Sequence, residues 1–191
     1  MDDLTEIERR FLVDGREDKP WRRGGKQFKI QQHYNIGALL HVHEHALYLN
    51  DVHATNLTER ELDLLRTVDS WTTRLRKRDE AYIMTYKSRL SDDTAYELEW
   101  SVSADLARRI LNEGPFPCVE KIRYVLEGSD GFLWEVDEFE GALAGLVLAE
   151  VELPSSQTEV ALPPWVGQEI TGLRSWSNRA LAETLSNQEG G

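Results

Sequence analysis

Charged residues recur at alternate positions in several short segments of this sequence. The first segment spans residues 5–13, in which Glu6, Glu8 and Arg10 are spaced by two. An extended strand points alternate side chains to opposite faces, so two carboxylates and one guanidinium share a face here. A strand that merely faces solvent would carry the same pattern, so this segment alone decides nothing about chemistry.

The same spacing returns along the chain, usually with one sign of charge in each segment. The further acidic pairs are Glu97 and Glu99, Glu135 and Asp137, and Glu150 and Glu152. The basic positions are Arg74 and Arg76, Lys121 and Arg123, and the single Lys87. The alternate positions between these residues are mostly apolar or aromatic. This segregation predicts that the charged faces line a wet cavity and that the apolar faces turn outward, because an uncompensated ion in a dry core costs several kcal/mol.

The residue types indicate what such a cavity would hold. Clustered carboxylates with few His or Cys neighbours favour the hard ions Mg²⁺ or Mn²⁺, which bind through a few oxygens and through substrate phosphates. Clustered Arg and Lys side chains bind phosphate oxygens. Together they predict a metal-assisted site for a short polyphosphate chain. The sequence contains no GxxxxGK[ST] segment, which excludes a P-loop enzyme.

Composition narrows the function classes further. The chain has 191 residues with 22 Lys plus Arg against 34 Asp plus Glu, and its net charge of -12 argues against a nucleic-acid partner. The single cysteine, Cys118, forms no internal disulfide, which favours the cytoplasm. No apolar run approaches the roughly 20 residues that span a bilayer, and no signal peptide is evident, so no membrane partner is expected. We expect one domain over residues 1–191.

Eight strands are expected from period-two alternation, near residues 5–13, 28–35, 73–78, 81–87, 95–102, 118–127, 132–141 and 145–153. Helices are expected after Thr58, which forms a capping box with Glu61, and after Ser103 and Ser177. Residues 162–172 are interpreted as a turn-rich or helical segment. Residues 36–72 form a probable insertion with a strand or hairpin at 39–49, whose alternate histidines fit either an exposed strand face or a zinc site.

Several ordered motifs together resemble the CYTH superfamily, the triphosphate tunnel metalloenzymes, and within it the bacterial tripolyphosphatase-like branch. They are EIERRFLV, RLR, YK, YELEW, EKIRY, WEVDEFEG, AEVEL and PPWVGQEITG. The resemblance implies a β-rich α+β fold, a closed eight-stranded antiparallel β-barrel that forms the triphosphate tunnel, with helices packed outside. It also implies metal-dependent hydrolysis of inorganic triphosphate, with Mg²⁺ or Mn²⁺ as the cofactor.

The resemblance also implies a role for each matching residue. The metal ligands are shared among Glu6, Glu8, Glu97, Glu99, Glu135, Asp137, Glu150 and Glu152. The substrate-binding cations are Arg10, Arg74, Arg76, Lys87, Lys121 and Arg123. Tyr34 and Lys87 are the catalytic pair that helps to activate water, and we expect neighbouring arginines to lower the pKa of Lys87. Arg10 stands where the family signature has lysine, which keeps the charge but changes its geometry.

Other functions of the same tunnel stay open at this stage. The alternatives are adenylyl cyclase, thiamine or nucleoside triphosphatase, and a non-catalytic module that binds polyphosphate. Each takes a triphosphate-containing small molecule as its partner. The insertion at residues 36–72 is a candidate lid over the tunnel or a candidate subunit interface, which leaves a homodimer open.

Overall fold

The computed structural model describes residues 4–15, 17–23 and 25–189. The ends of the expected domain, residues 1–3 and 190–191, lie outside this range. No helix in the described part of the chain is long and apolar enough to cross a membrane.

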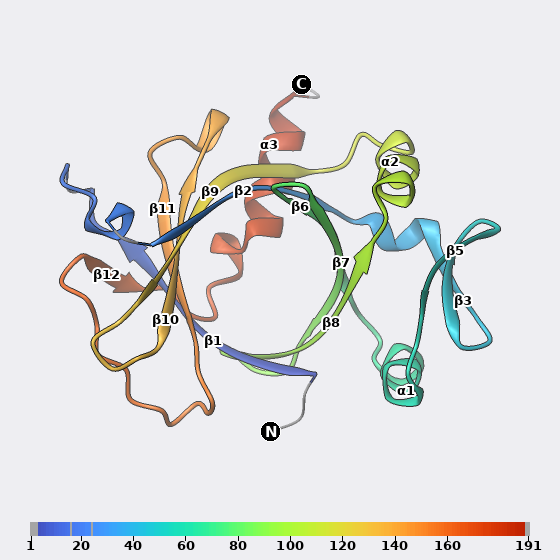
Figure 1. Cartoon of the computed structure of the whole chain (residues 1–191), viewed down its shortest axis with the longest axis horizontal. Helices are drawn as coiled ribbons and strands as arrows, with labels where there is room; N and C mark the ends of the chain where they lie inside the picture. The colour runs from blue at the N-terminus through green and yellow to red at the C-terminus, as the bar shows by residue number, and fades with distance from the viewer. Residues whose placement is uncertain (1–3, 16, 24, 190–191) are drawn as a thin grey trace.

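Eight antiparallel strands close into a barrel, seen almost end-on in Figure 1. They are β1 (Thr5–Val13), β2 (Lys26–Tyr34), β6 (Thr72–Arg78), β7 (Ala81–Arg89), β8 (Thr94–Val102), β9 (Cys118–Glu127), β10 (Leu133–Phe139) and β11 (Val147–Glu152). The order around the barrel is β11-β10-β9-β2-β6-β7-β8-β1, and pairing of β11 with β1 closes the ring. The closed eight-stranded barrel expected from the sequence is confirmed.

The register of the strands brings the alternating charges opposite one another. Glu8 lies opposite Glu152, and Arg10 lies opposite Glu150. Lys87 lies opposite Glu97 in the adjoining strands β7 and β8, of which β8 pairs with β1. Since paired residues point to the same face of a sheet, the charges of separate strands meet inside the barrel.

The outer face of the barrel is apolar and is covered partly by the segment that follows β2. This segment contains η2 (Ile36–Leu39), a second sheet of β3 (Leu40–His43), β4 (Ala46–Leu49) and β5 (Val52–Asn56), and α1 (Glu59–Thr67). Leu47, Leu49 and Leu62 pack in one core cluster with Leu75 and Leu98 of the barrel. A second covering helix, α2 (Ala104–Asn112), joins the same cluster.

The hairpin expected at residues 39–49 is confirmed as β3 and β4, and Thr58 and Glu61 form the expected capping box of α1. The expectation missed β5. The rings of His41 and His43 surround Tyr48 on the exposed face of this small sheet. Both histidines are exposed, which agrees with the expected exposed strand face.

Hydrogen bonds to the Glu138 carboxylate fix the loop between β1 and β2 against the outside of the barrel. This loop contains η1 (Pro20–Arg22). The Glu138 carboxylate accepts hydrogen bonds from Lys19 Nζ at 3.0 Å, Trp21 Nε1 at 2.7 Å and Arg22 Nε at 2.8 Å. These donors lower the pKa of Glu138 to about 2, although burial opposes the shift. These hydrogen bonds hold Trp21 against Trp165 in a second apolar cluster.

One end of the barrel is partly covered by α3 (Asn178–Glu189), which follows η4 (Arg174–Trp176) and lies behind the ring in Figure 1. Ala182 packs in one cluster with Tyr34, Val119, Phe139 and Leu148. By strand alternation, Tyr34, Phe139 and Leu148 belong to the inward faces of their strands. Thus α1 and α2 pack on the outside, whereas α3 packs against inward-facing side chains and narrows one end of the tunnel.

The segment expected to be turn-rich or helical is instead partly a strand, β12 (Val166–Glu169), which pairs with the end of β1. Turns at residues 164–165 and 171–172 agree with the turn-rich expectation, which missed the strand because four residues are too few to show a period. Gly167 permits the close approach of the two strands, since a Cβ there would lie 2.9 Å from the Leu12 carbonyl oxygen. The remaining short element is η3 (Gly141–Leu143).

Candidate active site

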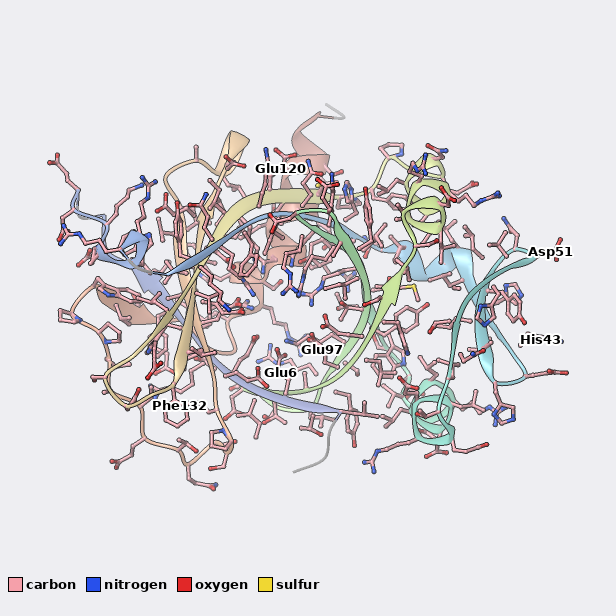
Figure 2. The ribbon with its side chains drawn as sticks, in the orientation of Figure 1. Glu6, His43, Asp51, Glu97, Glu120 and Phe132 are labelled. Atoms are coloured by element: carbon pink, nitrogen blue, oxygen red, sulfur yellow. The ribbon has the colours of Figure 1, made fainter. Side chains whose placement is uncertain are left out.

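Two adjoining cavities occupy the barrel. The larger, of about 590 Å³, opens at the end beside α3, and the smaller, of about 150 Å³, continues toward Val125 and Leu133. Six residues line both cavities: Glu6, Glu8, Arg10, Arg74, Lys87 and Asn178. Glu6 and Glu97 lie inside the ring in Figure 2, far from His43 on the small outer sheet. The tunnel is therefore lined by side chains of both signs.

Lys87 lies at the centre of an acidic group. Its ammonium pairs with Glu6, and its Nζ lies 3.2 Å from a carboxylate oxygen of Glu97 and 3.5 Å from one of Glu8. Burial works to lower the pKa of Lys87, but these three carboxylates outweigh it and raise the pKa above its ordinary value. The expectation that arginines would lower this pKa was wrong, because the strand register places Lys87 among carboxylates.

The same group affects the ionisation of its acidic members. Burial raises the pKa of Glu6 to about 8, and the charges of Glu8 and Glu97 add to this effect while Lys87 opposes it. Burial also disfavours ionisation of Glu97, but Arg74 and Lys87 lower its pKa to about 2. Of these two carboxylates, Glu97 is therefore the one that stays ionised at neutral pH, whereas the charges of its acidic neighbours disfavour ionisation of Glu6.

A second charged group surrounds Glu150 on the opposite wall. Arg10 Nη2 lies 2.6 Å from Glu150 Oε1, and Arg123 Nη2 lies 3.0 Å from Glu150 Oε2. Arg123 also donates two hydrogen bonds of 2.7 Å to Asp137 and pairs with Glu135. The two arginines hold the pKa of Glu150 well below its usual range against the effect of burial. These contacts fix Arg123 in place at the cavity wall.

Arg74 and Arg76 supply the cations of the third wall. Arg74 Nη2 lies 3.3 Å from Glu97 and 3.1 Å from Glu99, whereas the nearest carboxylate contact of Arg76 is 3.8 Å, to Glu99. Burial and the adjacent Arg74 charge lower the pKa of Arg76 to about 10. An anion in the tunnel would supply the compensation that Arg76 lacks.

Three residues that the resemblance assigned to the site lie away from the cavity surface in the described structure. Lys121 is 0% exposed, and its Nζ lies 2.5 Å from Asp137 Oδ2 beside the ring of Phe139. Neither Lys121, Asp137 nor Glu99 lines the two cavities. In this arrangement they support Arg123 and Arg74, and their direct contacts with substrate or metal remain predictions.

Tyr34 lines the larger cavity but is only 3% exposed. Its hydroxyl donates a hydrogen bond of 2.9 Å to Gln32 Oε1. Burial raises the pKa of Tyr34, although Arg74, Arg76 and Arg10 oppose the shift. The phenol therefore stays protonated at neutral pH and can donate a hydrogen bond.

The carboxylates that face the smaller cavity fit a hard divalent cation. Glu8, Glu135 and Glu152 line it, and the side chain of Glu152 forms no ion pair or hydrogen bond with any described residue. Burial raises the pKa of Glu152, and the charges of Glu135, Glu97 and Glu8 add to this effect. No three described ligand side chains converge on one point. This arrangement suits an ion such as Mg²⁺, which keeps several waters and uses one or two carboxylates together with phosphate oxygens.

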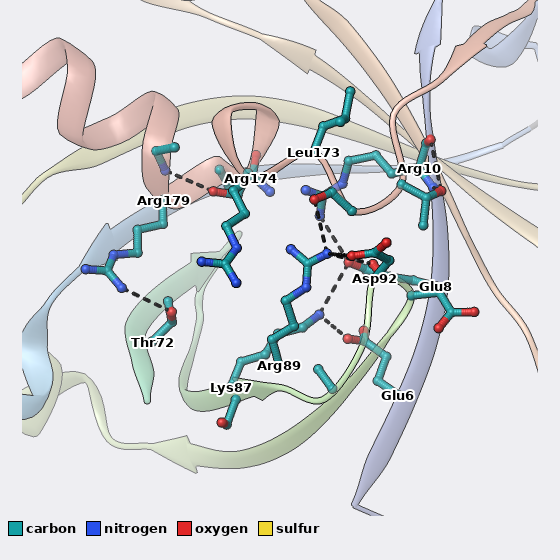
Figure 3. A pocket seen from close by; sticks show the side chains of 18 of the residues that line it. Glu6, Glu8, Arg10, Thr72, Lys87, Arg89, Asp92, Leu173, Arg174 and Arg179 are labelled. Atoms are coloured by element: carbon teal, nitrogen blue, oxygen red, sulfur yellow. Dashed lines mark hydrogen bonds and ion pairs between the residues drawn. The ribbon is translucent and has the colours of Figure 1, made fainter. Parts of the chain in front are cut away.

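The mouth of the larger cavity carries polar residues that the sequence analysis missed. They are Arg89, Arg174, Asn178 and Arg179, of which Figure 3 labels the three arginines. Arg89 continues the period-two spacing one step beyond Lys87 on β7, a signal that the sequence analysis did not use. Arg174 and Arg179 do not follow this spacing. For them the local signal was the helix start at Ser177, which indicated where α3 begins but not that it begins at the tunnel.

The fold and the charged tunnel define a class of β-barrel enzyme that acts on phosphorylated anions, and comparisons with known proteins narrow it. An inorganic triphosphatase from Nitrosomonas europaea is 37% identical over 147 residues, which cover 71% of this chain and 89% of that protein. One from Acetivibrio thermocellus is 37% identical over 106 residues, which cover 55% and 67%. The chain belongs to the inorganic triphosphatase family.

A solved structure agrees with this assignment. The crystal structure of the inorganic triphosphatase NE1496 matches with a TM-score of 0.54 and 29% sequence identity, over 93% of each chain. No family model matches the sequence.

Proposed function

We propose that this protein is a phosphoanhydride hydrolase of the CYTH superfamily that splits inorganic triphosphate inside its barrel. The observation that carries the proposal is the tunnel itself, where Arg10, Arg74, Arg76 and Arg123 face carboxylates across a narrow cavity. A linear triphosphate carries charge along its whole length, so cations on several walls can bind it at once. The named relatives support the same substrate. The free cysteine Cys118 supports a reducing compartment, the cytoplasm.

We propose Mg²⁺ or Mn²⁺ as the cofactor, held through Glu8, Glu135 and Glu152 and through phosphate oxygens. When bound, such an ion neutralises phosphate charge and lowers the pKa of coordinated water. The arginines orient the phosphate chain for in-line attack. Glu97 stays ionised and holds Arg74 and Lys87 in place for this task.

A substrate panel tests the proposal. Phosphate release should be measured with triphosphate, pyrophosphate, ATP and thiamine triphosphate in the presence of Mg²⁺ or Mn²⁺, and cyclic AMP should be assayed in parallel. We expect triphosphate to give the highest kcat/KM by at least about tenfold, because it alone fills the charged tunnel without an organic group. A higher kcat/KM for ATP or thiamine triphosphate, or formation of cyclic AMP, would refute this assignment.

We further propose that Lys87 acts as a fixed positive charge on a phosphate oxygen. The Tyr34 hydroxyl, which donates to Gln32 in this structure, then donates to a phosphate oxygen instead. Since the pKa of Lys87 is raised, its ammonium stays protonated across the neutral range. Lys87→Ala should therefore raise KM for triphosphate by about tenfold or more, because a charged contact is lost. Lys87→Arg should retain the pH profile of kcat between pH 6 and 9. If the pH profile of kcat in Lys87→Arg instead loses its alkaline part, then Lys87 is the residue that carries the proton.

A further inference from the structure

Arg174 differs from the other cations that line the larger cavity. Arg89 pairs with Asp92 at 2.6 Å, and Arg179 pairs with Glu183 at 2.9 Å. The cations of the barrel wall all contact carboxylates as well. Of the described Arg and Lys residues that line the larger cavity, Arg174 alone has a side chain that forms no ion pair or hydrogen bond. Its guanidinium is therefore available to an anion without the loss of an existing partner.

The first turn of α3 provides a second, independent observation. Asn178 is only 8% exposed and lines both cavities, yet its side-chain amide has no hydrogen-bond partner in the described structure, and Oδ1 is fully shielded. The Nδ2 group of this amide carries two donors with no acceptor among the described residues, so it can donate to an anion in the cavity. Oδ1 is an acceptor and does not itself contact the anion.

The backbone of the same turn adds further donors. Ser177 caps the helix, since the Ala180 amide donates to Ser177 Oγ at 3.1 Å and the Leu181 amide donates to its carbonyl at 3.0 Å. The amide groups of Asn178 and Arg179 precede the first intrahelical hydrogen bond, and no described group accepts from them. The positive end of the helix dipole therefore lies where Asn178 meets the tunnel.

We propose that Arg174, Asn178 and the first turn of α3 form a phosphate subsite at the tunnel mouth. It binds the terminal phosphoryl group of the substrate that lies nearest α3 and so positions the chain against the barrel cations. The inference rests on the proposed triphosphatase function for the identity of the substrate. Figure 3 shows Arg174 beside this mouth, between Leu173 and Arg179.

Arg174→Gln tests the charged part of the subsite. We expect KM for triphosphate to rise about tenfold with little change in kcat, since the lost contact is a charge-assisted hydrogen bond. The matched control is Arg109→Gln on α2, because the Arg109 side chain is likewise exposed and forms no ion pair or hydrogen bond with a described residue. Equal KM values for Arg174→Gln and Arg109→Gln would overturn the proposal.

Asn178→Asp separates ligand binding from a merely structural role. The substitution is nearly isosteric, and the favourable interaction of a carboxylate with the helix dipole offsets part of the cost of burying its charge, so Tm is measured beside KM for each variant. The same carboxylate should repel phosphate and raise KM by at least about tenfold. An unchanged KM in Asn178→Asp would contradict the subsite.

Binding without turnover distinguishes failure of the subsite from failure of the proposed function. Triphosphate with Ca²⁺, which should support little turnover, should raise the Tm of the wild-type protein and of Arg109→Gln, and should raise that of Arg174→Gln much less. A wild-type protein that shows this stabilisation but does not hydrolyse triphosphate would retain the subsite and refute the function. Active wild-type protein with equal stabilisation of Arg174→Gln would refute the subsite alone.

Discussion

Chelation of divalent metal should abolish triphosphate hydrolysis, with a loss of about 10³-fold or more. The reason is the excess of acidic over basic side chains where Glu8, Glu135 and Glu152 face the tunnel. Without a cation, Glu152 has no partner among the described residues and repels the phosphate chain. A metal that polarises phosphate oxygens contributes several kcal/mol to the transition state, which corresponds to this factor.

The measurement is phosphate release after exhaustive treatment with EDTA, followed by separate addition of Mg²⁺, Mn²⁺ and Ca²⁺. We expect Mg²⁺ or Mn²⁺ to restore the rate and Ca²⁺ to restore little, because Ca²⁺ accepts longer and looser coordination. Thermal unfolding before and after chelation is the control for loss of structure. Full turnover in metal-free buffer would show that the carboxylates serve another purpose.

Replacement of Glu8 by Gln should lower kcat/KM by about 100-fold at low metal concentration while the barrel stays folded. Glu8 lines both cavities and lies 3.2 Å from Arg10 and 3.5 Å from Lys87. The amide keeps the size of the side chain and can still accept hydrogen bonds. It removes the negative charge that a hard cation requires, and altered metal environments commonly cost 10–100-fold or more.

Glu120→Gln is the matched control, since Glu120 is exposed on β9 and lines neither cavity. The readouts are kcat/KM across a metal titration and the Tm of each variant. We expect high Mg²⁺ or Mn²⁺ to recover part of the activity of Glu8→Gln, because a weakened site fills at higher concentration. The metal role of Glu8 is wrong if both variants match the wild type at every metal concentration.

The local sequence determined the strands and their faces. Period-two alternation predicted all eight barrel strands. It also indicated that Glu6, Glu8 and Arg10 share a face, because successive side chains of a strand point to opposite faces whatever the rest of the fold. Charge segregation also predicted an inward charged face, because the desolvation cost of an ion does not depend on the topology.

The tertiary structure alone decided which charges meet. Whether Lys87 lies among arginines or among carboxylates depends on the register of β7 against β8 and on closure of the ring, and the actual neighbours Glu6, Glu8 and Glu97 reverse the direction expected for its pKa. Burial of Lys121 against Asp137 and Phe139 likewise depends on the register of β9 against β10.

The position of α3 is the clearest case of a feature that depends on distant segments. The sequence indicated a helix after Ser177, since capping is a local interaction. It held no sign that this helix would enter the barrel, because its docking depends on apolar contacts with Tyr34, Phe139 and Leu148 from three strands far away in the chain. Local hydrogen bonding therefore set where the helix begins, and long-range packing set that it begins at the tunnel.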